Sequence, residues 1–416
     1  MDKKSIRKNV VERFLRYVAI DTQSDEHIAE KPSTAGQWDL LHLLFDELKG
    51  MGVDDISLNE DGFLIARIPS TIAGRKQPPT IGFMAHVDTS CDISGKNVKP
   101  KIITSYDGKD IQLNKFWTLS VSENPVLLEY VGEDLITTDG TTLLGADDKA
   151  GVAEIMTIVQ YYMRYPEAKH GELEIIFTAD EETGHGMDRF PIDQLHARCC
   201  YTMDGGKRGE IEYECFNANR VELTFTGVMY HPGAARGRMV NAITMATRFC
   251  LMIPQTESPE TTDEKQGYYY FGEITGDSSL CTLTMNLRDF DSGGMSRRLH
   301  VVESAAKAIE ESSAKGTVNI SVTKQYVNMG EYVSKDPMVM EKLKHAVEDL
   351  GIKPLIKPIR GGTDGARMSE MGIPAPNIFA GGLNFHSRYE WIAVSAMVEA
   401  AGVIDALVQL WSQELV

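Results

Sequence analysis

The stretch Gly145-Ala146-Asp147-Asp148-Lys149-Ala150-Gly151 sets two neighbouring carboxylates between small residues, directly before an apolar run that predicts a helix over residues 152–165. Small residues on both sides let another group approach the backbone closely. One interpretation is a helix N-cap, because aspartate is favoured at that position and its charge suits the helix dipole. The other interpretation is a metal site, and the rest of the chain decides between the two.

Length and composition indicate a globular protein of two domains. The chain has 416 residues, of which 42% are hydrophobic, so it is too long for one simple core. Its net charge of −18 disfavours nucleic acid or an anionic membrane as a partner. No apolar run is expected to approach the roughly 18–20 residues that cross a membrane. The N-terminus is charged and the six cysteines are irregularly spaced, so we expect a cytoplasmic protein with reduced thiols.

Apolar, strand-like runs alternate with helical patterns through the first half of the chain. The strand-like runs cover residues 63–68, 80–85, 173–179 and 200–203, and the helical patterns cover residues 5–20, 37–49 and 152–165. Helical patterns return at residues 337–350 and 395–411, beside a short strand near 377–380. This alternation predicts an α/β fold in which a mixed or mostly parallel sheet is sandwiched by helices.

A different pattern interrupts the main domain. Polar and apolar residues alternate over 219–226 and 279–288, a further strand covers 317–324, and helical patterns lie at 241–252 and 296–313. Alternating strands with helices on one face predict a smaller antiparallel α+β domain. The main domain would therefore cover residues 1–213 and 326–416, with the inserted domain at 214–325.

Several metal-binding or proton-transferring side chains directly follow apolar strands. These are His86, Asp88, Glu181, Glu182 and Asp204, and His386 follows a Gly-rich turn after the last short strand. Because ligands bind at the carboxyl ends of strands in such sheets, these side chains can converge on one edge. Each also has a structural interpretation on its own, as a hydrogen-bonded pair, a solvated loop residue or a turn residue.

Taken together, these residues favour a pair of metal ions. Two histidines with several carboxylates suit a divalent ion such as zinc, which takes nitrogen and oxygen ligands. Two metals about 3.5–4 Å apart need a bridging carboxylate, and an aspartate in the glycine-flanked stretch 145–151 suits that role. One of Glu181 and Glu182 can bind metal while the other takes a proton from water, as metal-assisted hydrolysis requires.

Seven short motifs are distributed over nearly the whole chain: AHVDT (85–89), GADDKAG (145–151), TADEETG (178–184), MDGG (203–206), HPG (231–233), PIRGGTDG (358–365) and GGLNFH (381–386). In their sequence and order they resemble the motifs of the M20 family of dizinc aminoacylase- and carboxypeptidase-type peptidases. The resemblance implies a zinc-exopeptidase-like catalytic domain, with the inserted domain acting as a lid.

The resemblance also implies a ligand set for two zinc ions, with cobalt or manganese as alternatives. Asp147 would bridge the two ions. His86 and Asp204 would complete one site, and Glu182 and His386 would complete the other. A cis peptide bond is expected after the bridging aspartate.

Catalytic roles follow from the same resemblance. Glu181 would be the general base and would later protonate the leaving amine, with a hydroxide bridging the zinc ions as nucleophile. Asp88 would hold His86 in place. His231, in the inserted domain, would polarise the scissile carbonyl or hold the oxyanion, although it could equally be a loop residue before a Pro-Gly turn.

Substrate recognition points to two arginines. Arg288 and Arg360 could each bind a terminal carboxylate through two hydrogen bonds, or could be surface ion-pair partners. Asn241 is a further substrate candidate.

The expected function is an aminopeptidase that releases the N-terminal residue from short peptides, in particular tripeptides. One rival is another M20-type amidohydrolase, such as a dipeptidase, a carboxypeptidase or an N-acyl-amino-acid deacylase. A rival of another class is a non-catalytic binding protein that contains metal. The resemblance also implies a homodimer formed through the inserted domain.

Overall fold

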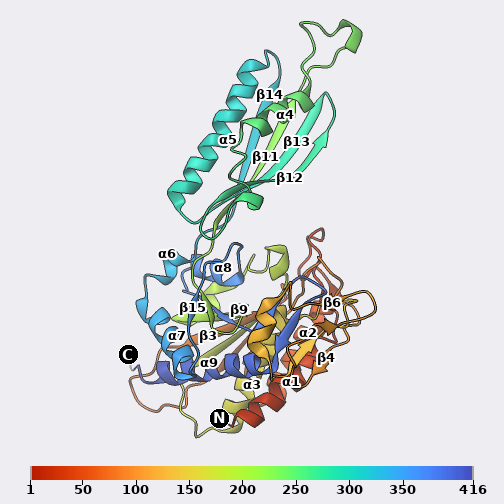
Figure 1. The fold of residues 1–416 in the computed structure, drawn as a ribbon. Helices are drawn as coiled ribbons and strands as arrows, with labels where there is room; N and C mark the ends of the chain where they lie inside the picture. The colour runs from red at the N-terminus through yellow and green to blue at the C-terminus, as the bar shows by residue number, and fades with distance from the viewer. Residues whose placement is uncertain (1, 415–416) are drawn as a thin grey trace. The chain divides into compact units, whose positions relative to one another are not determined.

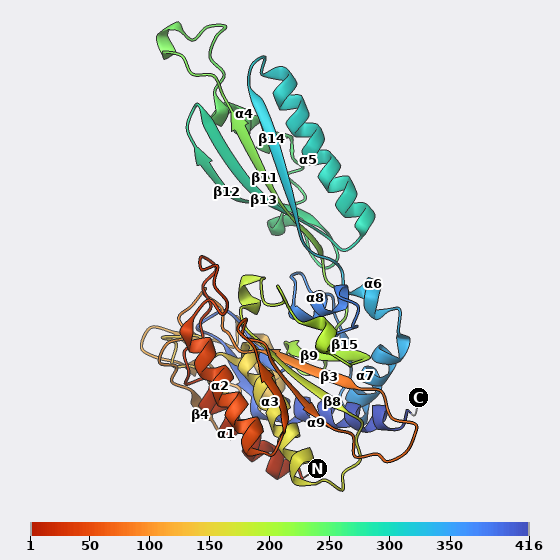
Figure 2. The ribbon, with the colours of Figure 1, turned by 180° about the vertical axis from the view of Figure 1, so that it is seen from behind.

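The computed structural model describes residues 2–414, which form two compact units. The larger unit runs to Tyr213, resumes over Glu331–Lys357 and continues from Thr363. The smaller unit consists of Glu214–Gly330 together with Pro358–Gly362. Figures 1 and 2 show the elements of each unit from opposite sides.

An eight-stranded mixed sheet forms the centre of the larger unit, in the order β1-β2-β8-β3-β9-β16-β10-β15. Its strands are β1 (Asp55–Leu58), β2 (Leu64–Ile68), β3 (Ile81–His86), β8 (Leu173–Thr178), β9 (Cys199–Gly205), β10 (Glu210–Glu212), β15 (Leu355–Ile356) and β16 (Asn377–Phe379). The central strands β8, β3, β9 and β16 run parallel. They therefore direct their carboxyl ends to the same edge, and every residue of β3 and β8 is buried.

Seven helices belong to the larger unit or begin at its boundary. They are α1 (Lys3–Tyr17), α2 (Ala35–Gly50), α3 (Ala146–Arg164), α6 (Gly330–Val333), α7 (Pro337–Asp349), α8 (Asp364–Glu370) and α9 (Val394–Ser412). Helix α3 is apolar on nearly all sides because it packs against α1, α9 and strand β3. Strands and helices together give the mixed α/β architecture that the sequence predicts.

Helix α9 corrects one expectation from the sequence. By length and composition it could cross a membrane, and it is the one such helix among residues 2–414. The acidic residues Glu399 and Asp405 interrupt the apolar sequence of this helix, so the sequence does not show it as a continuous apolar run. In the structure 56% of the most apolar 18-residue stretch of this helix is buried, and the helix packs against α1, α3 and α7.

The long stretch between β3 and α3 forms its own small layer. A four-stranded sheet in the order β17-β18-β7-β4 contains β4 (Lys101–Ile103), β7 (Leu135–Thr137), β17 (Gly382–Leu383) and β18 (Trp391–Ala393). A hairpin of β5 (Ile111–Gln112) and β6 (Thr118–Leu119) lies beside it in sequence. Strand β18 pairs with β7, so this layer joins a C-terminal segment to the residues that lead into α3.

The smaller unit is an antiparallel sheet in the order β12-β13-β11-β14, packed against two helices. Its elements are β11 (Asn217–Thr226), α4 (Ala242–Met252), β12 (Tyr268–Gly276), β13 (Leu280–Asp289), α5 (Ser292–Ser312) and β14 (Thr317–Tyr326). Alternate residues of β13 are buried, as expected for a sheet with one covered face.

The smaller unit begins at Glu214, as expected, but it does not end at the expected residue 325. Residues 326–330 and 358–362 also belong to it. The first segment is held by Asn328, whose side chain accepts a hydrogen bond from the Cys215 backbone. The second segment lies beside the residues that lead into β11, because Ile359 forms a parallel β-bridge with Cys215. Both contacts join residues far apart in sequence, which local patterns do not reveal.

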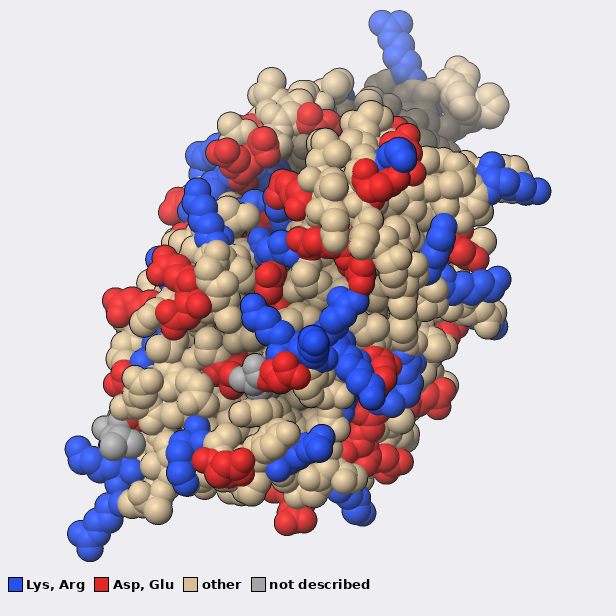
Figure 3. Space-filling model, turned by 60° about the horizontal axis from the view of Figure 1, so that its bottom comes forward, with Lys and Arg blue, Asp and Glu red and all other residues tan. Residues whose placement is uncertain are grey.

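Charged side chains of both signs lie on the face of the molecule drawn in Figure 3. On the face drawn in Figure 3, acidic and basic residues are interspersed. The net charge of −18 is therefore not concentrated in one acidic patch on that face.

Candidate metal centre

The corner that holds Asp147 is irregular backbone at the start of α3. Gly145 adopts a left-handed conformation with φ 84°, which suits glycine because it has no Cβ. Asp147 and Asp148 both have non-helical dihedral angles, and the peptide bond between them is cis, as the resemblance implied. The helix then continues regularly, so the corner presents Asp147 ahead of the helix.

Two imidazoles face opposite oxygens of the Asp147 carboxylate. His86 Nε2 lies 3.0 Å from Asp147 Oδ1, and His386 Nε2 lies 3.3 Å from Asp147 Oδ2. His386 Nε2 is also 2.9 Å from Glu182 Oε2, and His86 Nε2 is 3.6 Å from Asp204 Oδ1. The other four side chains that the resemblance implies as metal ligands therefore lie around the carboxylate of Asp147.

Each imidazole is backed by an aspartate on its other nitrogen. His86 Nδ1 lies 3.1 Å from the carbonyl oxygen of Asp88 and 3.3 Å from its carboxylate. His386 Nδ1 lies 3.0 Å from Asp92 Oδ2. Such partners fix the ring orientation and leave Nε2 directed at the Asp147 side, where a metal ligand must point.

The turn carrying the paired glutamates, Glu181–Thr183, is held at both ends. The buried carboxylate of Asp88 accepts hydrogen bonds from the backbone N–H groups of Glu181 and Glu182, each at 3.1 Å. On the other side, Asp180 has a left-handed φ of 63°. Its carboxylate accepts hydrogen bonds from Gln37 and from the backbone and hydroxyl of Ser33. The glutamate side chains are thus carried on a rigid turn.

Burial and crowding shift the ionisation of this cluster. Burial is the main cause that raises the pKa of Asp204 to about 6 and that of Glu182 to about 7. Burial would also raise the pKa of Asp147, but its hydrogen bonds with His386 and His86 lower that pKa below the usual value. Hydrogen bonds with Asp147 and Glu182 raise the pKa of His386 to about 11. Protonated imidazoles thus neutralise the acids, and bound cations would displace those protons.

The donor set fits divalent cations. Ligand atoms of His86, Asp147 and Glu182 lie within 4.8 Å of one another, as do those of His86, Asp148 and Asp204. Oxygen Oε1 of Glu182 is buried and has no hydrogen-bond partner among residues 2–414, although a buried carboxylate oxygen normally has one. A bound cation would satisfy it. Nitrogen and carboxylate oxygen donors together suit zinc and similar ions.

Asp148 has a different environment from Asp147. Its oxygens accept hydrogen bonds from the backbone N–H groups of His86, at 3.3 Å, and Gly151, at 3.2 Å. Of the two neighbouring acids, Asp148 therefore acts as the helix cap that the sequence suggested, while Asp147 faces the imidazoles.

The other predicted site residues lie in the smaller unit: His231, Asn241, Arg288 and Arg360. His231 is exposed, and its Nδ1 accepts a hydrogen bond from the Gly233 backbone. Asn241 caps α4 by accepting from the Thr244 backbone, a structural role.

The two arginines differ in how much of their hydrogen-bonding capacity is already used. Arg360 donates to the backbone carbonyls of Thr262, Glu264 and Gln266 and to the Thr262 hydroxyl. Its guanidinium also lies near the rings of Phe216 and Tyr268. Arg288 donates to the backbone carbonyl of its neighbour Leu287 and packs over the ring of Tyr326. Arg288 is therefore the better placed of the two to bind another carboxylate.

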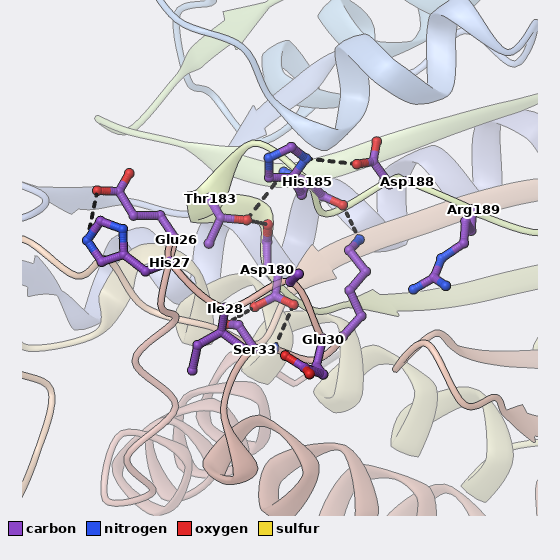
Figure 4. Close-up of a pocket in the computed structure, with 12 residues that line it drawn as sticks. Glu26, His27, Ile28, Glu30, Ser33, Asp180, Thr183, His185, Asp188 and Arg189 are labelled. Atoms are coloured by element: carbon purple, nitrogen blue, oxygen red, sulfur yellow. Dashed lines mark hydrogen bonds and ion pairs between the residues drawn. The ribbon is translucent and has the colours of Figure 1, made fainter. Parts of the chain in front are cut away.

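A cavity of about 490 Å³ in the larger unit borders the glutamate turn (Figure 4). Asp180 and Thr183 contribute to its wall, with Ser33 from the loop before α2. Its rim carries both signs of charge, including Glu26, Asp188 and Arg189. The cavity adjoins the candidate centre through the turn that both share.

Sequence reasoning missed two residues of this centre. The carboxylate of Asp92 contacts Nδ1 of His386. The carboxylate of Glu390 accepts hydrogen bonds from the backbone N–H groups that lead into α3. Glu390 follows His386 by four residues, but nothing in the spacing indicates its partner. Asp92 lies in an irregular loop, where no periodic pattern identifies a contact.

A third acid and histidine cluster on the larger unit is already satisfied. Ligand atoms of Glu172, Glu174 and His196 lie within 4.8 Å of one another. Glu174, however, pairs with Arg67 and accepts hydrogen bonds from the backbone N–H groups of His196 and Ala197.

Comparison with known proteins places this fold and site in context. The family model for peptidase family M20/M25/M40 matches residues 139–410. Peptidase T of Clostridium perfringens strain 13 is 46% identical over 407 residues, which cover 98% of this chain and 100% of that protein. Among solved structures, aminopeptidase PepT from Bacillus cereus aligns with a TM-score of 0.77 at 23% identity, covering 98% of this chain and 99% of that one. A dinuclear metal binding M20 peptidase from Bacillus subtilis aligns with a TM-score of 0.67 at 13% identity, covering 99% of each chain.

Proposed function

The chain belongs to peptidase family M20/M25/M40, and from this membership we propose that it is a metal-dependent aminopeptidase. Its substrates would be short peptides, in particular tripeptides, from which it would release the N-terminal residue. The observation that carries the proposal is the position of Asp147 between His86 and His386, one imidazole at each carboxylate oxygen.

Two divalent cations would be held at this cluster. His86 and Asp204 would bind one, Glu182 and His386 would bind the other, and Asp147 would bridge them. When bound, such ions lower the pKa of water and polarise a carbonyl group. Zinc is the expected ion, with cobalt or manganese as alternatives.

Glu181 would transfer the protons. Burial raises its pKa well above the usual value for glutamate, which makes its carboxylate a stronger base. It would accept a proton from the attacking water and deliver it to the amine that leaves. Asp88 would hold the general base Glu181 in position, because its carboxylate accepts a hydrogen bond from the Glu181 backbone N–H. Its backbone carbonyl also lies within hydrogen-bond distance of His86 Nδ1. His231 would stabilise the negative charge on the carbonyl oxygen.

Arg288 would select for short peptides by binding the C-terminal carboxylate. Its guanidinium keeps donors that Arg360 has already used. A guanidinium that binds the C-terminal carboxylate would favour one peptide length over others.

Hydrolysis of a small substrate panel tests the proposal. The metal-loaded protein should cleave free tripeptides in preference to dipeptides and N-acetylated amino acids, and the metal-stripped protein should not. Glu181→Gln should lower kcat by roughly 10²–10⁴-fold while it keeps its metals. The exposed Glu12→Gln on α1 serves as a control.

Three results would contradict parts of this proposal. Preference for N-acetylated amino acids would indicate a deacylase of the same family. Unchanged turnover by Glu181→Gln would remove its assigned role. Tight metal binding without hydrolysis of any substrate would favour a binding protein. The homodimer through the smaller unit and the cytoplasmic location stay predictions, and sedimentation analysis would measure the first.

A further inference from the structure

Glu390 is a buried acid whose carboxylate accepts hydrogen bonds from backbone N–H groups beside the candidate metal centre. Its side chain is 1% exposed. Oxygen Oε2 accepts hydrogen bonds from the N–H groups of Leu144, at 2.6 Å, and Gly145, at 2.8 Å. Oxygen Oε1 accepts from Ala146, at 2.7 Å, and Asp147, at 3.2 Å. One carboxylate thus receives the N–H groups of four consecutive residues, the last of which is Asp147.

The backbone there has the shape of an anion-binding concavity. Successive N–H groups point to one place when left-handed and right-handed conformations alternate, and Gly145 supplies the left-handed residue. The first N–H groups of a helix also lack partners within it, and the helix dipole favours a negative charge at that end. In many proteins such a concavity binds an external anion. Here the chain fills it with its own glutamate.

Secondary structure fixes Glu390 in this position. The next residue, Trp391, begins β18 and pairs with Thr137 of β7, a few residues before the corner. Trp391 is fully buried against Tyr130. Pairing of these strands brings the segment containing His386 and Glu390 alongside the segment that ends at Asp147.

We propose that Glu390 is a positioning residue for the metal centre. By bonding the backbone of residues 144–147, it sets the direction of the Asp147 carboxylate, so that one oxygen faces His86 and the other faces His386. Because His386 lies in the same segment, a single element would set both a bridging ligand and a terminal ligand. This inference rests on the proposed metal sites, since without cations Asp147 has nothing to bridge.

Glu390→Gln tests the assignment, because it keeps the size of the side chain but replaces one acceptor oxygen by an NH₂ group. Glu174→Gln is a matched control: Glu174 is equally buried and also accepts backbone N–H groups, but it bonds Arg67 and lies outside the centre. Metal-free samples of each protein would be titrated with Co²⁺ by calorimetry, and their cobalt absorption spectra would be recorded. The metal-free samples would also be unfolded thermally.

The expected result separates positioning from simple stabilisation. Glu390→Gln should bind Co²⁺ about 10–100-fold more weakly, as is typical when a partner behind the ligands is lost, and its spectrum should change. Glu174→Gln should lose stability and keep the wild-type affinity and spectrum. If both variants unfold at lower temperature but bind Co²⁺ as the wild type does, Glu390 supports the fold alone and the inference fails.

A second measurement applies even if Glu390→Gln does not fold. In the metal-free wild type, the amide protons of residues 144–147 should exchange slowly with solvent, since Glu390 bonds them without any metal. Fast exchange there would overturn the inference. Failure of the proposed function is distinguishable, because it would appear as a wild type that binds fewer than two Co²⁺ ions.

Discussion

The carboxylate of Asp92 lies 3.0 Å from Nδ1 of His386, on the ring nitrogen opposite the one that faces Asp147. Asp92 is itself held by the hydroxyl of Ser90, which donates to the same oxygen at 3.1 Å. The pair repeats, on the second imidazole, the contact that Asp88 makes with His86. It differs in exposure, because the side chain of Asp92 is 63% exposed and that of Asp88 is fully buried.

Loss of Asp92 should weaken the metal site that contains His386. In Asp92→Ala the ring loses the partner that orients it, so we expect about tenfold weaker binding of one metal ion and little change at the other. Stepwise Co²⁺ titration of the metal-free protein measures this. Asp107→Ala is the control, since Asp107 is similarly exposed and pairs with Lys109 instead. Equal weakening of both ions would count against the assignment of His386 to one site.

The two arginines should respond differently to substitution. Arg288→Ala should raise KM for tripeptides roughly 10–100-fold, the cost of one charged hydrogen-bonded contact, and leave the melting temperature nearly unchanged. Arg360→Ala should lower the melting temperature, because it leaves three backbone carbonyls without their donor. Steady-state kinetics and thermal unfolding of both variants check this. A large KM effect from Arg360→Ala on a stable protein would reverse the two roles.

Glu154 should make the protein less stable as pH rises. It is fully buried in α3, neither of its oxygens has a hydrogen-bond partner, and burial raises its pKa well above 4.5. The folded state therefore holds this proton more tightly than the unfolded state does. The stability that this proton contributes is complete below the unfolded pKa and is lost as pH rises through the folded pKa.

Glu154→Gln removes that dependence. At pH 8 the variant should melt about 2–4 °C above the wild type, and the difference should shrink toward pH 5. The exposed Glu341→Gln on α7 should show no such trend. A difference that grows as pH falls would contradict the prediction.

Removal of metal should destabilise the larger unit. Several carboxylates crowd around Asp147, and bound cations would offset their repulsion. Metal at about 100 times its Kd would stabilise the folded state by about 2.7 kcal/mol, so a chelator should lower the melting temperature by several degrees. Thermal unfolding with and without chelator measures this. Glu182→Ala should show a smaller shift, and an equal shift would place the metal elsewhere.

The central sheet and its ligands were predictable because they follow from strand ends. His86 is the last residue of β3 and Asp204 is the second-last residue of β9, and these strands are parallel neighbours. Apolar runs mark such strands clearly, and parallel pairing brings their carboxyl ends together. The short strands β1, β10 and β15 were not predicted, since two to four residues carry too little periodicity.

The contacts that loop residues make with distant parts of the chain could not be predicted from sequence patterns. Asp92 and His386 are separated by 294 residues, and Glu390 lies 243 to 246 residues from the backbone that it bonds. Neither partner lies on a periodic element, so only the folded chain reveals the pairing. The same reason applies to the segment 358–362, which joins the smaller unit through Ile359 and Arg360.

That short returning segment bears on any attempt to exchange modules between relatives. A chimaera that transplants only residues 214–330 would leave the carbonyls of Thr262, Glu264 and Gln266 facing a foreign five-residue loop. Arg360 would therefore have to be transplanted together with residues 214–330, which contain its aromatic neighbours Phe216 and Tyr268. We therefore expect a chimaera to fold when residues 214–330 and 358–362 are transplanted together, and to fail when residues 214–330 are transplanted alone.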